Sequence, residues 1–179
     1  MPDIPSTLET ARLVLRPFRL DDVDAVFAFA TDPEWARFLL VPQPYERRHA
    51  EEFLAKQVLA DPATDVSWAI EHKGTVIGGI DLRFHHDGRI GEIGYSIARE
   101  WWGQGMVTEA ARAVINGAFE SMSALARLRA WVDARNLASQ RVMEKLGMTR
   151  EGTLRGNAYV RGEAVDQVWF GLLRDEWRR

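Results

Sequence analysis

A glycine-rich turn is the segment of this sequence best suited to hold an anion. Gly103 and Gly105 stand between an alternating stretch, Ile90–Ile97, and a run of apolar residues at helical spacing. In the first turn of a helix the backbone N–H groups have no intrahelical acceptor, and the aligned peptide dipoles add partial positive charge. A phosphate or pyrophosphate could therefore dock against residues 103–107, where the two glycines let it approach the backbone closely.

The helix after this turn is predicted from its apolar period. Its apolar residues recur three and four positions apart, as on one face of an amphipathic helix. Two well-known phosphate loops do not fit the turn, because a dinucleotide-binding fingerprint needs a third glycine where Thr108 stands and a P-loop needs Gly-Lys-Ser/Thr. A lone Gly-x-Gly arises by chance, so other segments must identify the anion. The apolar residues are Val107, Ala110, Ala111, Val114, Ile115, Ala118 and Phe119.

Length and composition limit the classes of protein to consider. With 179 residues, 46% of them apolar, and no linker, we expect one domain over residues 1–179. The net charge of -3 and a pI near 5.8 argue against nucleic acid as a partner. The chain has no cysteine, which excludes a disulfide framework and a thiolate metal site. Residues 1–7 lack an apolar core and the longest strongly apolar run is Phe38–Val41, so we expect a cytoplasmic protein without a membrane partner.

Strand and helix patterns alternate along the chain and predict an α/β fold. Lys73-Gly74 predicts a tight turn between two strands, and a strand–helix–strand passage predicts that residues 128–132 run parallel to residues 90–97. Predicted strands are 12–18, 66–71, 75–84, 90–97, 128–132, 149–155 and 164–173. Predicted helices begin at Asp21 or Asp22, at Asp32-Pro33 with a reach to Leu39, at Tyr45, after Gly105 and at Asn136, the last ending at Gly147. Trp68, Trp131 and Trp169 are expected in the core.

Several segments together resemble one enzyme family. Trp102–Ala110 resembles the acetyl-coenzyme A pyrophosphate loop of the GNAT N-acetyltransferases, and Asn136–Met148 resembles the second signature of that family. Thr10–Phe18, Glu92–Tyr95 and the ending from Glu151 to Trp177 resemble the subgroup of ribosomal-protein alanine N-acetyltransferases. The resemblance covers nearly the whole chain.

The resemblance implies a GNAT fold, with a mixed, splayed central sheet of six to seven strands flanked by helices. In it the strands ending at Ile97 and Val132 diverge, and the pantetheine arm of acetyl-coenzyme A lies in the gap, with its thioester paired to the backbone of residues 93–97. Acetyl-coenzyme A is the implied co-substrate, and no metal is implied. The implied cofactor-binding residues are Ile93, Tyr95, Ile97, Trp101, Gly103, Gln104, Gly105, Met106, Val107, Asn136 and Ser139.

Acyl transfer to an amine requires a proton acceptor, because only a neutral nitrogen has the lone pair that attacks the thioester. Glu92 is the candidate, acting directly or through water, since it lies in the strand beside the expected cofactor and shares a face with Gly94 and Ser96. A salt bridge or structural hydrogen bond is the alternative role of this carboxylate.

The leaving thiolate requires a proton donor. Many family members use a tyrosine seven residues after the motif asparagine, but here that position is Met143. Ser139 shares a helix face with Met143 and matches the serine that the ribosomal-protein subgroup uses instead, although its hydroxyl could merely satisfy the backbone. Asn136 is expected to cap the helix, to contact the pantetheine arm, or both.

The acceptor is predicted less sharply than the donor. Trp35 and Phe38 in the first helical segment, with Asn157 and Tyr159 in the last hairpin loop, are expected to form the wall of the acceptor site. The subgroup resemblance implies a protein N-terminal α-amine as acceptor. A small-molecule amine such as a polyamine or an aminoglycoside-like antibiotic is the alternative, as is a non-catalytic coenzyme A-binding or sensor module. The choice of acyl group and a homodimeric assembly are left open.

Overall fold

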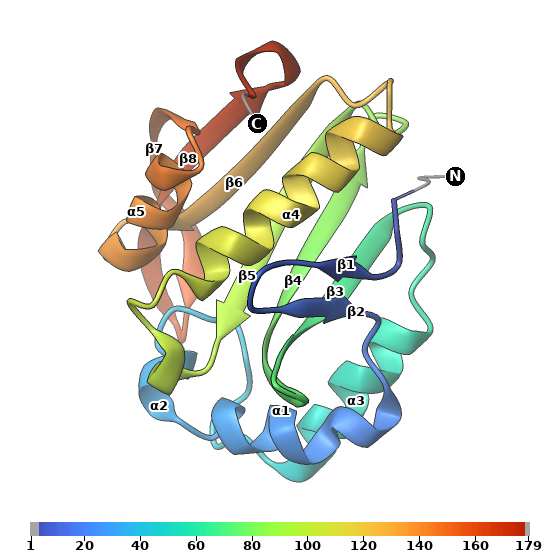
Figure 1. Cartoon of the computed structure of the whole chain (residues 1–179). Coiled ribbons are helices and arrows are strands. Elements are labelled where there is room, and N and C mark those ends of the chain that lie inside the picture. Colours follow the sequence, from blue (N-terminus) through green and yellow to red (C-terminus); the bar gives the residue numbers. More distant parts are fainter. Residues whose placement is uncertain (1–3, 178–179) are drawn as a thin grey trace.

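An eight-stranded sheet forms the centre of the computed structural model, which describes residues 4–177. The strand order is β1-β2-β3-β4-β5-β6-β8-β7 (Figure 1). Seven strands correspond to predicted ones, and β1 is additional because two residues carry no period that a sequence pattern could reveal. The strands are β1 Leu8–Glu9, β2 Val14–Arg16, β3 Asp65–His72, β4 Thr75–His85, β5 Ile90–Ile97, β6 Arg127–Asp133, β7 Thr149–Val160 and β8 Glu163–Leu173.

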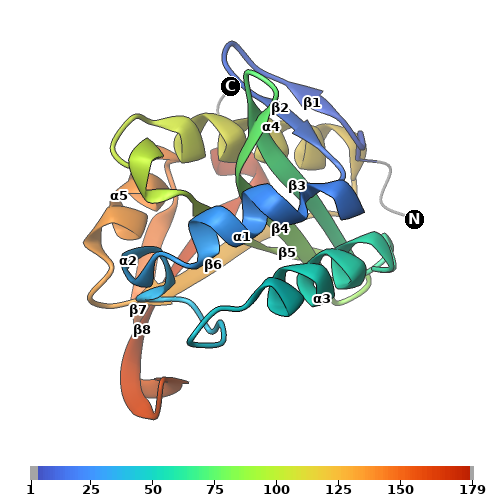
Figure 2. The same ribbon diagram turned by 90° about the horizontal axis from the view of Figure 1, so that it is seen from below.

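Helices cover both faces of the sheet. Because neighbouring side chains of a strand point to opposite faces, Trp68 packs with α4 while Ala69 packs with α1 and α3 (Figures 1 and 2). All seven apolar positions predicted for α4 are buried. The helices are α1 Val23–Ala30, α2 Pro33–Ala36, α3 Arg47–Val58, α4 Met106–Ser121 and α5 Leu137–Lys145.

The predicted ends of the elements are mostly confirmed. The side chain of Asp32 caps α2 by accepting a hydrogen bond from the backbone N–H of Glu34 at 2.9 Å, with Pro33 in the first turn. Lys73 and Gly74 both have positive φ, as a two-residue hairpin turn requires, and Gly147 has φ 76° just after α5. The predicted reach of α2 to Leu39 is wrong, because the helix ends at Ala36 and the chain continues in turns.

The last hairpin is longer than predicted. Asn157 and Tyr159 lie inside β7, so their expected place in a hairpin loop is wrong. Pairing of β7 with β8 is interrupted between Leu154 and Ala158 and then resumes to Val160. Gly156 and Asn157 therefore lie at an irregularity within β7 and not in the turn of the hairpin.

The sheet splits between β5 and β6, its one parallel pair. These strands pair only from Ile90 to Glu92, whereas β5 stays paired with β4 to Ile97 and β6 stays paired with β8 to Asp133. From Ile93 onward the β6-facing edge of β5 therefore has no strand partner in the described chain. The mixed, splayed sheet is confirmed, with eight strands in place of the expected six to seven.

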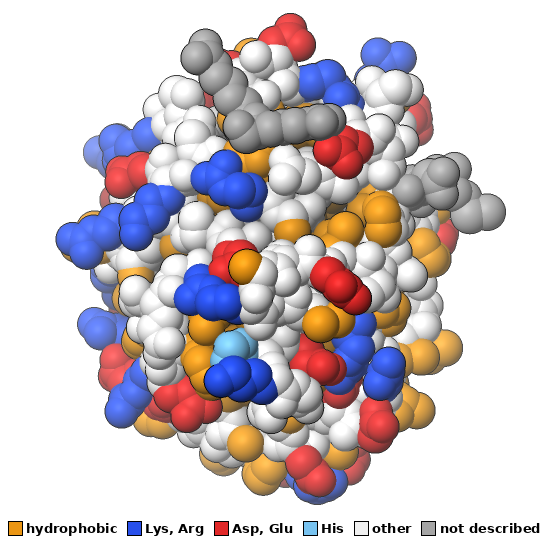
Figure 3. Space-filling model, viewed as in Figure 1, with side chains coloured by type: hydrophobic (Ala, Val, Ile, Leu, Met, Phe, Trp, Pro, Cys, Tyr) orange, Lys and Arg blue, Asp and Glu red, His pale blue; other side chains and the backbone are white. Residues whose placement is uncertain are grey.

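The core lies mainly between the sheet and α4. Trp68 is fully buried there as expected, but Trp131 and Trp169 are only half-buried, so the expectation that they belong to the core is wrong. Acidic and basic side chains are interspersed over the face that carries α4 (Figure 3). Within residues 4–177 no helix has the length and apolar character needed to cross a membrane.

Candidate active site

A cavity of about 480 Å³ lies where β5 and β6 separate. Residues 93–96 of β5 line it on one edge of the gap, and residues 131–133, at the end of β6, line it on the other. Helix α5 contributes Asn136, Ser139 and Met143, and further lining residues come from α1, from α3 and from the segment between these two helices. The cavity has the size of a site for a small molecule or for the end of a chain.

A pair of hydroxyl groups bridges the gap inside this cavity. The hydroxyl of Tyr95, on β5, lies 2.8 Å from Oγ of Ser139 and can also donate to the Ser139 carbonyl at 3.2 Å. Asn136 caps α5, as predicted, by accepting a hydrogen bond from the Ser139 N–H at 3.1 Å. Burial raises the pKa of Tyr95 to about 12, an effect that its hydrogen bond with Ser139 only partly opposes. Tyr95 is therefore a protonated hydrogen-bond donor at neutral pH.

Glu92 lines the same cavity and is held by an ion pair. Its side chain is buried, with the residue 8% exposed, and Oε2 accepts a hydrogen bond from Nε of Arg129 at 2.9 Å. Nη1 of Arg83 lies 4.0 Å from Oε1 of Glu92, and Nε2 of His85 lies 3.8 Å from its Oε2. The salt bridge considered as the alternative is thus present, and Glu92 is at the same time a residue that lines the cavity. The role of Glu92 as a proton acceptor stays a prediction.

Besides Glu92, the cavity is lined by three acidic residues that were not predicted, Asp65, Asp81 and Asp133. Asp81 lies on β4 over Gly94 of β5, so close that a Cβ at Gly94 would stand 2.9 Å from Oδ1 of Asp81. Burial raises the pKa of Asp81, although Arg83, which donates from Nε to Oδ2 at 2.9 Å, opposes the shift. The available signal was an acidic residue between two apolar residues, Ile80 and Leu82, which are both buried in β4.

The acceptor wall agrees only in part with the predicted residues. Trp35 and Phe38 line the cavity, together with aromatic residues that the sequence analysis did not select: Phe18, Phe29, Tyr45 and Phe53. Asn157 and Tyr159 are not among the lining residues. The Asn157 amide donates to Oε1 of Gln167 at 2.7 Å, and Tyr159 is 69% exposed on the protruding β7–β8 hairpin (Figure 2).

The glycine turn lies apart from the cavity, at the start of α4. Gly103 and Gly105 adopt φ values of 73° and 77°, which favour glycine, and nothing lies within 4 Å of where a Cβ at Gly103 would stand. The open backbone and the free N–H groups at this helix start fit an anion. The side chains of Met106 and Val107 are buried, so these two residues could offer only backbone groups.

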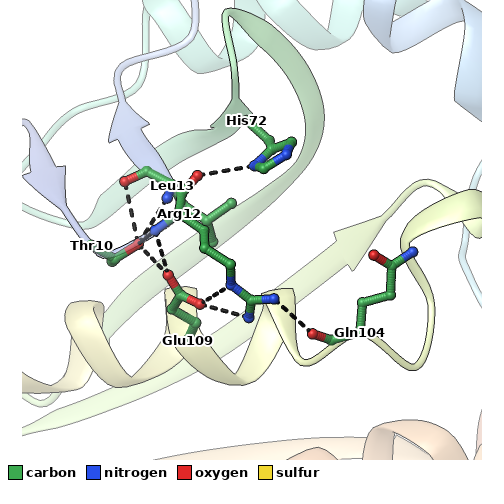
Figure 4. A network of polar contacts seen from close by, with 6 residues as sticks. All are labelled: Thr10, Arg12, Leu13, His72, Gln104 and Glu109. Carbon is green, nitrogen blue, oxygen red and sulfur yellow. Dashed lines mark hydrogen bonds and ion pairs between the residues drawn. The ribbon is translucent and has the colours of Figure 1, made fainter.

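A polar network fixes this turn to the N-terminal part of the chain (Figure 4). Glu109, in the first turn of α4, accepts hydrogen bonds from Oγ1 of Thr10 at 2.6 Å and from Nε of Arg12 at 2.7 Å. Nη1 of Arg12 donates to the carbonyl of Gln104 at 3.1 Å. The position of the Gln104 backbone, between the two glycines, therefore depends on a residue 92 positions earlier.

The remaining predicted cofactor residues divide between the cavity and the core. Ile93 and Tyr95 line the cavity, whereas Ile97 is buried in the cluster that packs against α4. Trp101 lies in a short helical turn before the glycines, with its ring 4.8 Å from that of His72. The structure thus joins the cavity and the open edge of β5, while the glycine turn lies at the start of the helix that follows β5.

Comparison with known proteins identifies the family. The model of the acetyltransferase (GNAT) domain matches residues 12–149. The chain belongs to the GNAT acetyltransferase family. It is 30% identical over 177 residues to the uncharacterized N-acetyltransferase p20 of Bacillus licheniformis. This alignment covers 96% of this chain and 98% of that protein. It is 37% identical over 107 residues to the protein of Bacillus subtilis named "Putative ribosomal N-acetyltransferase YdaF", over 59% of this chain and 58% of that one.

A solved GNAT acetyltransferase from Bacillus anthracis superimposes with a TM-score of 0.85 at 25% identity, covering 95% of this chain and 99% of that one. The protein is therefore an acyl-coenzyme A-dependent acetyltransferase with the GNAT fold, as the resemblance in its sequence implied. The split between β5 and β6 in this GNAT enzyme brings the cavity to the bare edge of β5, where a donor group could pair with main chain.

Proposed function

We propose that this enzyme transfers an acetyl group from acetyl-coenzyme A directly to the N-terminal α-amine of a protein. The observation that carries the proposal is the continuity of the cavity with the open edge of β5 between Ile93 and Ser96. A donor thioester paired with that edge would meet an amine that enters the cavity. A volume of about 480 Å³ accommodates the end of a chain and its first side chain, and the name of the YdaF relative supports a protein acceptor.

The residues for the donor follow from main-chain geometry. In this proposal the backbone N–H groups at the start of α4, with Gly103 and Gly105, hold the pyrophosphate. Arg12 keeps the Gln104 backbone in place for that contact. Acetyl-coenzyme A supplies the activated acyl carbon. Because these contacts use main chain, they leave the side chains of the cavity free to select the acceptor.

The proposed chemistry uses two side chains of the cavity. Glu92 takes the proton of the ammonium form of the acceptor, directly or through water, and passes it to solvent. The neutral nitrogen then attacks the thioester carbon and gives Glu92 a second proton as the amide forms. A carbon–nitrogen bond forms, the carbon–sulfur bond breaks, and the electron pair of that bond stays on sulfur. Ser139 lies across the gap and donates its proton to the sulfur.

The test is a thiol-release assay with acetyl-coenzyme A and a panel of amines. The panel contains a peptide with a free N-terminus, the same peptide with a blocked N-terminus and an internal lysine, a polyamine and an aminoglycoside. We expect turnover on the free peptide and none on the blocked one. Turnover on the polyamine or aminoglycoside alone would refute a protein acceptor, and tight binding of acetyl-coenzyme A without turnover on any amine would refute the catalytic role. Mass spectrometry of intact ribosomal proteins, with and without the gene, tests a ribosomal acceptor.

A further inference from the structure

We propose that Tyr95 is a positioning residue that directs the Ser139 hydroxyl toward the departing sulfur. The inference rests on the proposed function. It starts from a contact that crosses the gap between β5 and α5, two elements that belong to opposite sides of the cavity. The Tyr95 hydroxyl lies 2.8 Å from Oγ of Ser139, and both residues line the cavity.

The hydrogen-bond capacity of the two hydroxyls decides what this contact can do. A hydroxyl carries one hydrogen and two acceptor lone pairs. When Tyr95 donates to Oγ of Ser139, the hydrogen of Ser139 is left for a third atom. Within residues 4–177 the Tyr95 and Ser139 hydroxyls have no hydrogen bonds to other side chains. The third atom is therefore one that enters the cavity.

The alternative arrangement would disable Ser139. If Tyr95 donated to the Ser139 carbonyl at 3.2 Å, the Ser139 hydroxyl would donate to Tyr95 and its hydrogen would not face the substrate. At 2.8 Å either hydroxyl can donate, and the proposal assigns the arrangement in which Tyr95 donates to Oγ of Ser139. Burial keeps Tyr95 protonated because it raises the pKa of the phenol, so Tyr95 can act as donor over the whole range in which amines are acetylated.

The surroundings explain why strand β5 supplies this hydroxyl. Met143, one helical turn after Ser139 on α5, lines the cavity with a side chain that cannot donate, and it is 2% exposed. The chain has three tyrosines. Tyr159 lies outside the cavity, and the hydroxyl of Tyr45, which lines it, makes no hydrogen bond with the described residues. Tyr95 is the tyrosine that contacts Ser139.

Two proton transfers accompany the transfer of the acetyl group from sulfur to nitrogen. The acceptor nitrogen, already neutral when it attacks the thioester carbon, gives one proton to Glu92 as the carbon–nitrogen bond forms, and the sulfur takes a proton from Oγ of Ser139 as the carbon–sulfur bond breaks. The alkoxide that forms on Ser139 is stabilised by the hydrogen bond from Tyr95, which keeps its own proton. Ser139 then takes a proton from water, and Glu92 releases one to water.

The experiment compares Tyr95→Phe, Ser139→Ala and the double variant, with Tyr159→Phe, at a tyrosine that is 69% exposed and lies outside the cavity, as the matched control. Each is assayed by thiol release with an amine that the wild type acetylates, so the result does not depend on the acceptor being an N-terminus. Hydrolysis of acetyl-coenzyme A in the absence of amine gives a second readout, because it also releases the coenzyme A thiolate, which needs a proton. Thermal unfolding of each variant reports on folding.

We expect Tyr95→Phe to lower kcat by about 10- to 100-fold, the loss of one hydrogen bond to a charged group, with KM for acetyl-coenzyme A within about twofold. The double variant should be no slower than Ser139→Ala, because the two hydroxyls act as a unit. Tyr159→Phe should change kcat by less than about twofold. A Tyr95→Phe enzyme with unchanged kcat, a multiplicative loss in the double variant, or a raised KM with a lowered melting temperature and unchanged kcat would overturn the proposal.

Discussion

Replacing Glu109 by Gln tests how the N-terminal segment holds the glycine turn. The Glu109 carboxylate accepts hydrogen bonds from Oγ1 of Thr10, from the Arg12 backbone N–H at 2.9 Å and from Nε of Arg12, and Nη2 of Arg12 lies 2.6 Å from Oε2. A glutamine can keep the contacts of one oxygen, but its NH₂ group faces the donors of the guanidinium. The variant therefore loses the two-pronged ion pair.

The magnitude follows from the exposure of the pair. A hydrogen bond to a charged group contributes about 1.5–3 kcal/mol when buried. The side chains of Arg12 and Glu109 are 42% and 20% exposed, so solvent screening reduces the expected loss to roughly 1–2 kcal/mol. In a chain of this size that lowers the melting temperature by roughly 2–8 °C. Losing the Arg12–Gln104 contact as well should raise KM for acetyl-coenzyme A about fivefold, with kcat unchanged at saturation.

The dependence on pH gives this prediction its sign. Burial raises the pKa of Glu109, but the hydrogen bonds from Thr10 and Arg12 outweigh it, and the net pKa lies below the usual value. A carboxylate with a lowered pKa stabilises the fold above its unfolded pKa, and that contribution is lost as pH falls through the folded pKa. Calorimetry should show a larger destabilisation by Glu109→Gln at pH 7 than in acid. Glu144→Gln, on the exposed side of α5, is the control. An equal effect of both variants, or an unchanged KM, would refute the reasoning.

Three further predictions concern the turn, the cavity and the buried ion pair. Gly103→Ala should raise KM for acetyl-coenzyme A, whereas Gly147→Ala, with a similar positive φ and open surroundings, should lower only stability; equal KM values would contradict the anion site. Burial raises the pKa of Asp81, so its charge costs stability as pH rises, and Asp81→Asn should gain more in melting temperature at pH 7 than at pH 4; a larger gain at pH 4 would contradict it. Asp22→Ala should lower the free energy of unfolding by about 3 kcal/mol, because it leaves the guanidinium of buried Arg16 without its two-pronged partner; denaturation within about 1 kcal/mol of wild type would contradict it.

What the sequence could predict depended on whether the signal was local. The apolar period of α4 and the turn at Lys73 predict the observed elements, because neighbouring residues determine both. The gap beside Ile93 was anticipated only through the family resemblance. The contact of Tyr95 with Ser139 joins residues 44 positions apart, and no local pattern contains it.

The residues that the sequence misplaced or did not reveal share one physical cause, which is that pairing with another strand determines their positions. Gly156 and Asn157 form a typical turn pair, yet cross-strand pairing with β8 carries β7 past them to Val160. The sequence neighbours of Asp81 in β4 are apolar, and only the register of β4 with β5 places the Asp81 carboxylate beside Gly94. Tertiary pairing therefore decides positions that local propensity leaves open.

The split in the sheet separates two kinds of recognition. On the edge of β5 beyond Glu92 the free groups are main chain, and at the start of α4 they are main chain as well. In the proposed function, side-chain changes there affect donor binding only through backbone geometry. The wall of the cavity includes side chains from other elements, among them Trp35, Phe38 and Asp81. The proposed function therefore predicts that changes at these three positions alter which amine enters without moving the groups proposed to hold the donor. The specificity of this enzyme for its acceptor should follow the wall, and its affinity for acetyl-coenzyme A should follow the turn.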